Sequence, residues 1–371
     1  MPLDQKQDSK NGFGEEEFVI GKVSRVGPSE VNDALKSSTG MISTRQIVNI
    51  NIVEGKLSGK SVDVANEITD NPVFNINCKP GQEVVLSVVT TPGGKYEVNI
   101  ADYHRAPALG WLLLVFLIVF VLFGGKQGLK SLVGLIVSVA LIAFVLLPAS
   151  LHGFNPLLVA ILICLVSTGT SMLFVAGRSK KCLAAVLGTL GGVVAAGIAA
   201  QLVISSAPLT GLSSEEAQIL RGSVLVQGTD FYKGLLAAGM LIGALGVIMD
   251  VGISIASAVA EVAKTASASS LTVKDLYQSG MNVGRDIMGT MTNTLILAYT
   301  GSALPLLMLI AQIPSTKLIN LDLVATEVAS AISGSLGLVL TIPLTAYCAA
   351  RLMASDGNAA NPAQVNASRT K

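Results

Sequence analysis

The sequence contains few charged residues, and this shortage narrows the class of protein. Of its 371 residues, 13% are charged and 51% are hydrophobic, and the formal net charge is only +1. No basic run interleaved with aromatic residues occurs, so nucleic acid is not an expected partner. This composition is typical of a membrane protein rather than of a large soluble core.

Histidine and cysteine are also scarce. His104 and His152 lie near expected membrane boundaries, where an interfacial role is more ordinary than a catalytic triad or a metal site. The cysteines have neither the spacing of a disulfide framework nor that of a zinc motif, so we interpret them as buried small hydrophobic residues. They are Cys78, Cys164, Cys182 and Cys348. The sequence therefore predicts no bound metal and no cofactor.

Long apolar runs are what the sequence has in abundance. Seven of them approach the ~20 residues that a helix needs to cross a hydrocarbon slab of ~30 Å. They cover about 106–123, 129–147, 156–176, 183–205, 234–259, 284–311 and 325–350. Pro305 interrupts the sixth run and Pro343 the seventh. We therefore expect an α-helical multi-pass membrane protein with about seven transmembrane helices over 105–353, and the lipid bilayer as its first partner.

A different pattern precedes these runs. Polar and apolar residues alternate in short stretches over 17–103, as in Phe18–Val23 and Gln46–Val53, and turn signals separate the stretches. This predicts an N-terminal small all-β barrel or sandwich domain of about five strands, residues 15–104. The segment Gly55–Ser61 resembles a phosphate-binding loop, but its glycines are one residue too close and no helix is expected after it, so we interpret it as a hairpin turn.

The ends and the long connections have their own composition. Residues 1–14 and 354–371 are expected to form a disordered leader and a disordered tail. Between the fourth and fifth spans, Ser213–Glu216 gives a short acidic helix signal. Between the fifth and sixth, the sequence is amphipathic around Leu271–Tyr277.

The basic residues predict the orientation of the spans. With the spans numbered in order, one side receives Lys126, Lys130, Arg178, Lys180, Lys181, Lys264, Lys274 and Arg351, and the other receives Arg105, Arg221, Lys233 and Lys317. The richer set is expected in the cytoplasm of a cell membrane protein, which places the β-domain outside and the tail inside. Residues 1–30 contain no signal peptide or extra span, so export of the β-domain would rest on the first span acting as a reversed anchor. Otherwise the chain is truncated at its start, or the orientation is reversed.

One face of the fifth span carries a stripe of small and polar residues. At roughly 100° per residue its members stay within about 40° of Asp250. They are Gly239, Gly243, Gly246, Asp250, Ser254, Ser257 and Glu261. Because a carboxylate in hydrocarbon costs several kcal/mol, we expect this stripe to look into a protein interior or a wet cavity.

The sixth span opens with a second polar region. Within Asn282–Tyr299, one face presents Asp286, Thr290, Asn293 and Leu297, and Arg285 precedes them. Asp250 lies sixteen residues past Gly234, roughly 24 Å along the helix, so Asp286 should sit at nearly the same level. The expected substrate or ion pathway comprises Asp250, Ser254, Ser257, Arg285, Asp286, Thr290 and Asn293.

Each of these positions has a structural alternative. Gly239, Gly243 and Gly246 are expected to permit close helix packing rather than ligand contact. Ser254 and Ser257 suit helix-packing hydrogen bonds, and Asn293 suits an interhelical bond as well as a substrate contact. The aspartates could form a charge pair with Arg285 instead of a pathway. For two further carboxylates, Glu261 is expected past the inner boundary, and Glu327 is interfacial or an outer gate.

The run Gly284–Tyr299, with Met249–Ala258 before it, resembles the YibE/F family of bacterial multi-pass membrane proteins. The resemblance extends over 17–353, including the turn at Asn71–Pro72 and the closing segment Ile342–Thr345. The family implies membrane residence without an assigned substrate. Its members often begin with a further hydrophobic span ahead of the β-domain, and this sequence departs from that pattern.

Three functions remain open from the sequence. The first is a transporter or channel with an acidic intramembrane site, for which a cation or protons fit best unless Arg285 faces the substrate. The second is a sensor or assembly scaffold whose β-domain binds a ligand or partner. The third is an intramembrane aspartyl enzyme, and it ranks last because no nucleophile motif is present; we expect no enzyme. The expected partners are a small solute or ion and a second copy or another membrane protein.

Overall fold

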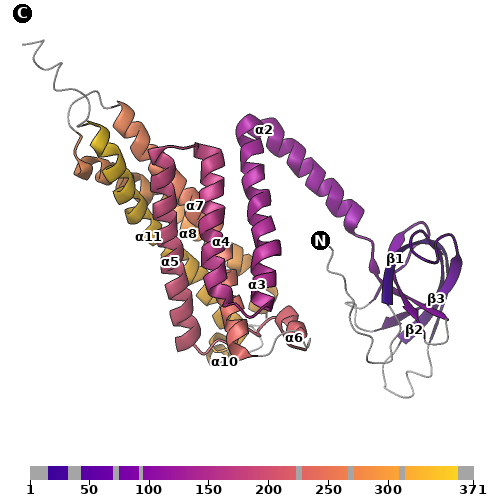
Figure 1. The fold of residues 1–371 in the computed structure, drawn as a ribbon. Helices are drawn as coiled ribbons and strands as arrows, with labels where there is room; N and C mark the ends of the chain where they lie inside the picture. Colours follow the sequence, from indigo (N-terminus) through magenta and orange to yellow (C-terminus); the bar gives the residue numbers. More distant parts are fainter. Residues whose placement is uncertain are drawn as a thin grey trace, which may run out of the picture. The chain divides into compact units, whose positions relative to one another are not determined.

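The computed structural model describes residues 16–31, 43–69, 75–91, 95–222, 228–265, 271–308 and 314–357. The chain divides into two compact units, Met1–Val119 and Phe120–Lys371 (Figure 1). The leader 1–14 and most of the tail lie outside the described residues.

The first unit is built on one antiparallel sheet of five strands. Its strands are β1 (Glu16–Val31), β2 (Ser43–Ile52), β3 (Ser61–Thr69), β4 (Glu83–Thr90) and β5 (Tyr96–Tyr103). They lie in the order β3-β2-β1-β4-β5, and the edge strands β3 and β5 contact each other without forming a ladder. The sheet is thus a half-barrel, so the predicted small all-β fold with five strands is confirmed.

Alternation along β1 explains the core of this sheet. Val19 and Val23 are buried, whereas Phe18, which precedes Val19 and points to the other face of the sheet, is 62% exposed. A side chain at Gly21 would begin 2.6 Å from both Ile50 and Leu86, so glycine is needed at this point. Aliphatic side chains of the neighbouring strands and the buried Cys78 complete the core. Burial raises the pKa of the Cys78 thiol.

The segment Gly55–Ser61 is a hairpin connection, as the sequence predicted. Asn51 of β2 pairs with Ser61 of β3, and the Gly59 amide donates to the Ile52 carbonyl over 2.8 Å. Gly55 and Gly59 have φ of +83° and +79°, which glycine adopts without strain. The phosphate-loop resemblance therefore has no structural counterpart.

Helices make up the rest of the described chain. They are α2 (Ala106–Leu141), a π-helical turn η1 (Ile142–Leu146), α3 (Leu147–Leu151), α4 (Pro156–Ala176), α5 (Lys180–Ser206), α6 (Glu215–Gly222), α7 (Thr229–Thr265), α8 (Val273–Ser302), α9 (Leu304–Met308), α10 (Ser315–Ile319) and α11 (Asp322–Gly357). Their starts follow local chemistry: Asn155 caps α4 ahead of Pro156, Ser179 caps α5, and Thr272 with Asp275 forms a capping box on α8. The acidic signal at Ser213–Glu216 became α6.

Five helices among the described residues are long and apolar enough to cross a membrane, fewer than the seven expected. They are Ala106–Leu151, Pro156–Val175, Lys180–Ser206, Thr229–Thr265 and Asp322–Ala354. The first two expected spans fall within one stretch of 46 residues, which breaks its helical geometry at Gly125 (φ 53°, ψ −140°). The sixth expected span is missing from the set because α8 is too polar.

Helix boundaries correct several other expectations. The sixth span was expected from residue 284, but α8 begins at Val273 because the capping box lies there. It ends at Ser302, and Pro305 falls in the separate helix α9, as expected of an interrupting proline. Pro343, by contrast, lies inside the continuous helix α11. That helix runs to Gly357, so the first four residues of the expected tail are helical.

Close packing in the bundle rests on glycines opposite threonines. A side chain at Gly188 of α5 would collide with Thr345 of α11, and one at Gly192 would collide with Thr341. Gly252 of α7 meets Thr189 of α5 in the same way. Small residues let helix backbones approach closely, as in membrane helix pairs. The bundle core therefore lies where α5, α7 and α11 meet.

The outward positions of α4, α5 and α11 are large and apolar. On α11, Val328, Ile332 and Leu336 are 52%, 54% and 47% exposed. On α4 and α5, the same holds for Leu158, Leu162, Leu183, Ile198 and Leu202. Exposure of such a surface to water is unfavourable, whereas contact with lipid hydrocarbon is not. The apolar helices and their outward surfaces suggest a membrane protein.

Apart from Arg285, the described basic residues of the second unit gather at two ends of the bundle. Antiparallel contacts, such as Gly134 with Ser171 and Gly188 with Thr345, bring the break of α2 at Gly125, the α4–α5 and α7–α8 connections and the end of α11 to one end. The opposite end carries α3, α6 and α10 (Figure 1). The first end holds Lys126, Lys130, Arg178, Lys180, Lys181, Lys264, Lys274 and Arg351, and the second holds Arg221, Lys233 and Lys317.

Candidate functional site

The expected pathway residues lie on α7 and α8, two antiparallel helices that pack against each other. A side chain at Gly284 would begin 3.4 Å from Ile255, and one at Gly280 would begin 2.8 Å from Val259. Gly284 lies level with Ile255, and the helices are antiparallel, so Asp286 lies level with Ile253. Asp250 lies three residues before Ile253, toward the start of α7. The two aspartates are therefore offset by ~4.5 Å along the helix axes, within one turn.

The stripe on α7 lies on the outside of the described bundle and not in its interior, which was one of the two surroundings expected for it. Its exposed members are Gly239, Gly243, Gly246, Asp250, Ser254 and Glu261. Ser257 is half-buried and donates a hydrogen bond to the Ile253 carbonyl over 2.6 Å. The opposite face of α7 is the buried one, with Leu241, Ile248 and Ile255 in the core.

The three glycines of the stripe do not hold described helices together. Nothing lies within 4 Å of a side chain built at Gly239 or Gly246, and the position at Gly243 meets only the Tyr299 side chain, whose hydroxyl lies 2.5 Å away. The packing glycines are others, which sequence reasoning did not select: Gly188, Gly192, Gly252, Gly280, Gly284, Gly334 and Gly337. Spacing alone could not distinguish them, because both sets have helical periodicity.

The outward face of α8 is polar along most of its length. Arg285, Asp286, Gly289, Thr290 and Asn293 are all exposed. The Thr290 hydroxyl donates a hydrogen bond to the Ile287 carbonyl over 2.9 Å, so its hydrogen bond is formed within α8. Within the described ranges, neither aspartate of the expected site forms an ion pair with Arg285. The structure thus brings the expected residues to neighbouring helices but leaves their charges without partners among the described residues.

Helix α11 packs against both α7 and α8. Its outward face contrasts with the outward faces of those two helices. The outward positions of α11 are Leu323, Val328, Ile332, Leu336, Leu340, Leu344 and Tyr347. Its inward positions include small and hydroxyl residues such as Ser330 and Thr341. On α8 the polarity is reversed, since charged and amide groups point outward. The two surfaces cannot both be suited to lipid.

A second polar position lies between α7, α8 and α11. The Tyr299 hydroxyl of α8 faces Gly243 of α7, and Glu327 of α11 is near enough to interact with it electrostatically. Glu327 is half-buried. The sequence offered an interfacial or a gating role for Glu327, and its phenol neighbour was not foreseen because the two residues come from different helices.

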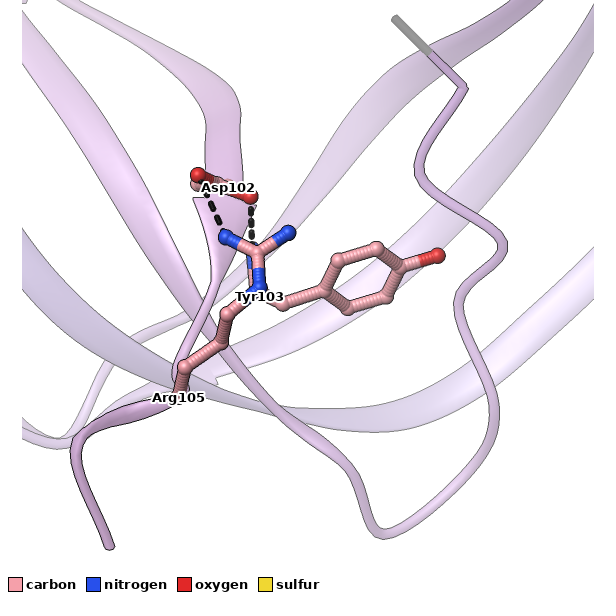
Figure 2. A network of polar contacts seen from close by, with 3 residues as sticks. All are labelled: Asp102, Tyr103 and Arg105. Carbon is pink, nitrogen blue, oxygen red and sulfur yellow. Dashed lines mark hydrogen bonds and ion pairs between the residues drawn. The ribbon is translucent and has the colours of Figure 1, made fainter. Parts of the chain in front are cut away.

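The β-domain carries a polar network at the end of β5. Figure 2 shows Asp102, whose Oδ2 accepts a hydrogen bond from Arg105 Nη1 over 2.8 Å and whose Oδ1 accepts one from the Tyr103 amide over 2.7 Å. The guanidinium lies 5.3 Å from the centre of the Tyr103 ring. The hydrogen bond from Arg105, then that from the Tyr103 amide, hold the pKa of Asp102 below its usual value. His104 contacts Glu83 beside this network over 2.9 Å.

The same domain has an open pocket beside this network. It measures about 500 Å³ and is lined by Asn77, Lys79, Gln82 and Tyr103. The Asn77 amide donates to the Tyr103 hydroxyl over 2.6 Å, which fixes the ring at the pocket wall. Among the described residues, no group of three His, Cys, Asp or Glu side chains is placed to hold a metal ion.

A half-barrel domain followed by a bundle of apolar helices suggests the class of multi-helix membrane proteins. The comparison with protein families then gives the particular family. A family model described as YibE/F-like protein matches residues 112–355, and one described as YibE/F family N-terminal domain matches residues 18–103. The chain belongs to the YibE/F family, as the resemblance predicted. Comparisons with curated proteins and with solved structures found no match.

Proposed function

We propose that this protein is an integral membrane transporter or channel whose pathway runs along the polar faces of α7 and α8. The observation that carries the proposal is the exposure of Asp250, Arg285 and Asp286 on a bundle whose other outward faces are apolar. A charged side chain at the centre of a bilayer costs about 2.5 kcal/mol or more on the lowest scales. Water or another polar surface must therefore meet these residues.

The chemistry of the two faces favours a cation or protons. Asp250 and Asp286 supply two carboxylates, and Ser254, Thr290 and Asn293 supply neutral oxygens nearby. Carboxylate and carbonyl oxygens are the groups that hard cations prefer, and intramembrane carboxylates commonly carry protons. Arg285 gives the site one positive charge, which would control access of a cation or, in the converse case, attract an anion.

In this proposal the β-domain lies outside the cytoplasm of a cell membrane protein and the end of α11 lies inside. The support is the gathering of basic residues at one end of the bundle, since basic loops stay in the cytoplasm. The aspartates act in ion passage rather than in aspartyl chemistry, so the protein is not an enzyme.

A second function is favoured by one observation, the open pocket of the β-domain. Its wall combines the cation of Lys79 with the amides of Asn77 and Gln82 and the Tyr103 hydroxyl. Such a set could recognise a small polar ligand, and the protein would then be a sensor or an assembly scaffold.

Flux measurement in proteoliposomes tests the transport proposal. Asp250→Asn and Asp286→Asn keep side-chain size and remove the charge, so each should abolish most proton or monovalent cation flux while detergent melting stays close to that of the parent. Glu216→Gln on the exposed face of α6 is the matched control and should retain flux. Equal flux in the parent, both aspartate variants and protein-free vesicles would reject the proposal and favour the scaffold.

A further inference from the structure

The charges on the outward faces of α7 and α8 lack partners among the described residues. Arg285 and Asp286 are adjacent on α8, and Asp250 lies on α7 within about one helical turn of their level. A charge at membrane depth is stable when it is paired or hydrated, and a stranded partner is costly. Something outside the described chain must therefore face these groups.

We infer that a second copy of this chain covers these faces and that the charges pair between the two copies. Copies inserted by the same rule have the same orientation in the bilayer, so a twofold axis relating them runs along the membrane normal. Such a contact is isologous, and residues at one level of the first copy meet residues at that level of the second. Arg285 of each copy then faces Asp286 and Asp250 of the other, a self-complementary arrangement of charge.

The shape of the surface agrees with close approach of a helix. Side chains built at Gly239, Gly246 and Gly289 would meet nothing within 4 Å, so this part of the surface is not covered by any described residue. Gly239 and Gly246 are spaced by seven residues, about two turns of α7, and small residues on one face let membrane helices approach closely. Glycine spacing alone would not identify the occupant. The charge complementarity at a shared level identifies a second copy.

The described outward faces of α5 and α11 lack these properties. The outward positions of α11 are apolar from Leu323 to Tyr347, and those of α5 include Leu183, Ile198 and Leu202. Lipid suits these positions, since lipid tails are as apolar as leucine. The dimer contact is thus assigned to the faces of α7 and α8 and to no other.

This inference does not depend on transport. Two copies facing each other would enclose the polar groups away from lipid, and the enclosed surface would be the pathway if the protein conducts. A dimer without flux would support the dimer contact and reject only the transport proposal. Flux from a protein that shows no contact at these faces would support transport and reject only the dimer contact.

Cysteine cross-linking in native membranes tests the contact. In the full chain with the native cysteines replaced, Asn293→Cys and Thr290→Cys each place a thiol on the inferred face, and Leu336→Cys places one on the apolar face of α11. Oxidation with copper phenanthroline should convert Asn293→Cys or Thr290→Cys into a disulfide-linked dimer, with only background dimer from Leu336→Cys. Equal yields at the three positions, or a cross-link to a different protein only, would overturn the inference.

Charge exchange tests the pairing itself. Arg285→Glu gives a face with two adjacent negative charges, and Asp286→Arg gives one with two positive charges, so each variant alone should lose most of its cross-linked dimer through like-charge repulsion. Coexpression of the two, with different tags on the Asn293→Cys background, should restore a dimer that carries both tags. This rescue also shows that both variants fold. Dimer yields that are insensitive to both changes, or the absence of rescue, would overturn the pairing.

Discussion

The hydroxyl oxygen of Thr341 on α11 occupies the place where a side chain at Gly192 on α5 would begin. The Gly337 carbonyl oxygen lies 2.7 Å from the same point, so backbone as well as side chain would have to move. Gly337 meets α5 in return, since its own side chain would begin 2.6 Å from Ala196. The two helices are therefore fitted to each other by the absence of side chains at both glycines.

Replacement of Gly192 should consequently destabilise the bundle. Gly192→Ala should cost about 1–3 kcal/mol, the usual range for overpacking, and Gly192→Leu more, as measured by thermal unfolding in detergent. Gly169→Ala on α4 is the control, because nothing lies within 4 Å of its new methyl group. A melting temperature for Gly192→Ala at or above that of Gly169→Ala would show that α5 and α11 do not pack as described.

The Asp102 network gives a pH prediction for the β-domain. Because Arg105 and the Tyr103 amide depress the pKa of Asp102 in the folded state, the carboxylate stabilises the fold above its ordinary value of 3.8, and this stability is lost as the pH falls through the lower, folded value. The pair is exposed, so Asp102→Asn should lower stability at pH 7 by at most about 1 kcal/mol.

Urea unfolding of residues 15–108 at pH 7 and at pH 2 would measure this effect. The difference between the parent and Asp102→Asn should be smaller at pH 2 than at pH 7. The control is Glu54→Gln, in the exposed turn after β2. An equal difference at the two pH values would mean that Asp102 acts through something other than its charge.

Topology can be measured by thiol labelling in intact cells. With the native cysteines removed, Ser179→Cys between α4 and α5 should be protected from an impermeant reagent, because Arg178, Lys180 and Lys181 favour the cytoplasm. Ser214→Cys at the start of α6 should react. The reverse pattern would place the β-domain in the cytoplasm.

The sequence predicted whether an element is a strand or a helix better than it predicted where the element ends and what surrounds it. Alternation such as that of Phe18–Val23 was enough for the sheet, because period-two burial is local. The five apolar helices were visible in composition, but the first two expected spans lie in one helical stretch that bends at Gly125, and the charges of α8 remove a third. Neither effect can be read from the length of an apolar run.

For the candidate site too, the sequence predicted local features but not those that depend on contacts between distant residues. The periodicity of Asp250, Ser254 and Glu261 correctly gathered them on one face of a helix, and a count of rise per residue placed Asp286 within a turn of Asp250. Which face points outward depends on contacts such as Gly284 with Ile342, which join residues far apart in sequence. For that reason the sequence left two surroundings open for the stripe, a protein interior and a wet cavity, and the structure places it on the outside of the described bundle.

In the transport proposal, the outward face of α7 at the level of Asp250 meets water or a polar path rather than lipid. Reaction of single cysteines with a small charged thiol reagent in membranes measures this directly. Ser254→Cys should react at a rate well above that of Leu336→Cys, whose position on α11 is surrounded by other exposed apolar residues. Equal, background rates at both positions would contradict the account, because Ser254 would then lie in the same apolar surroundings as Leu336.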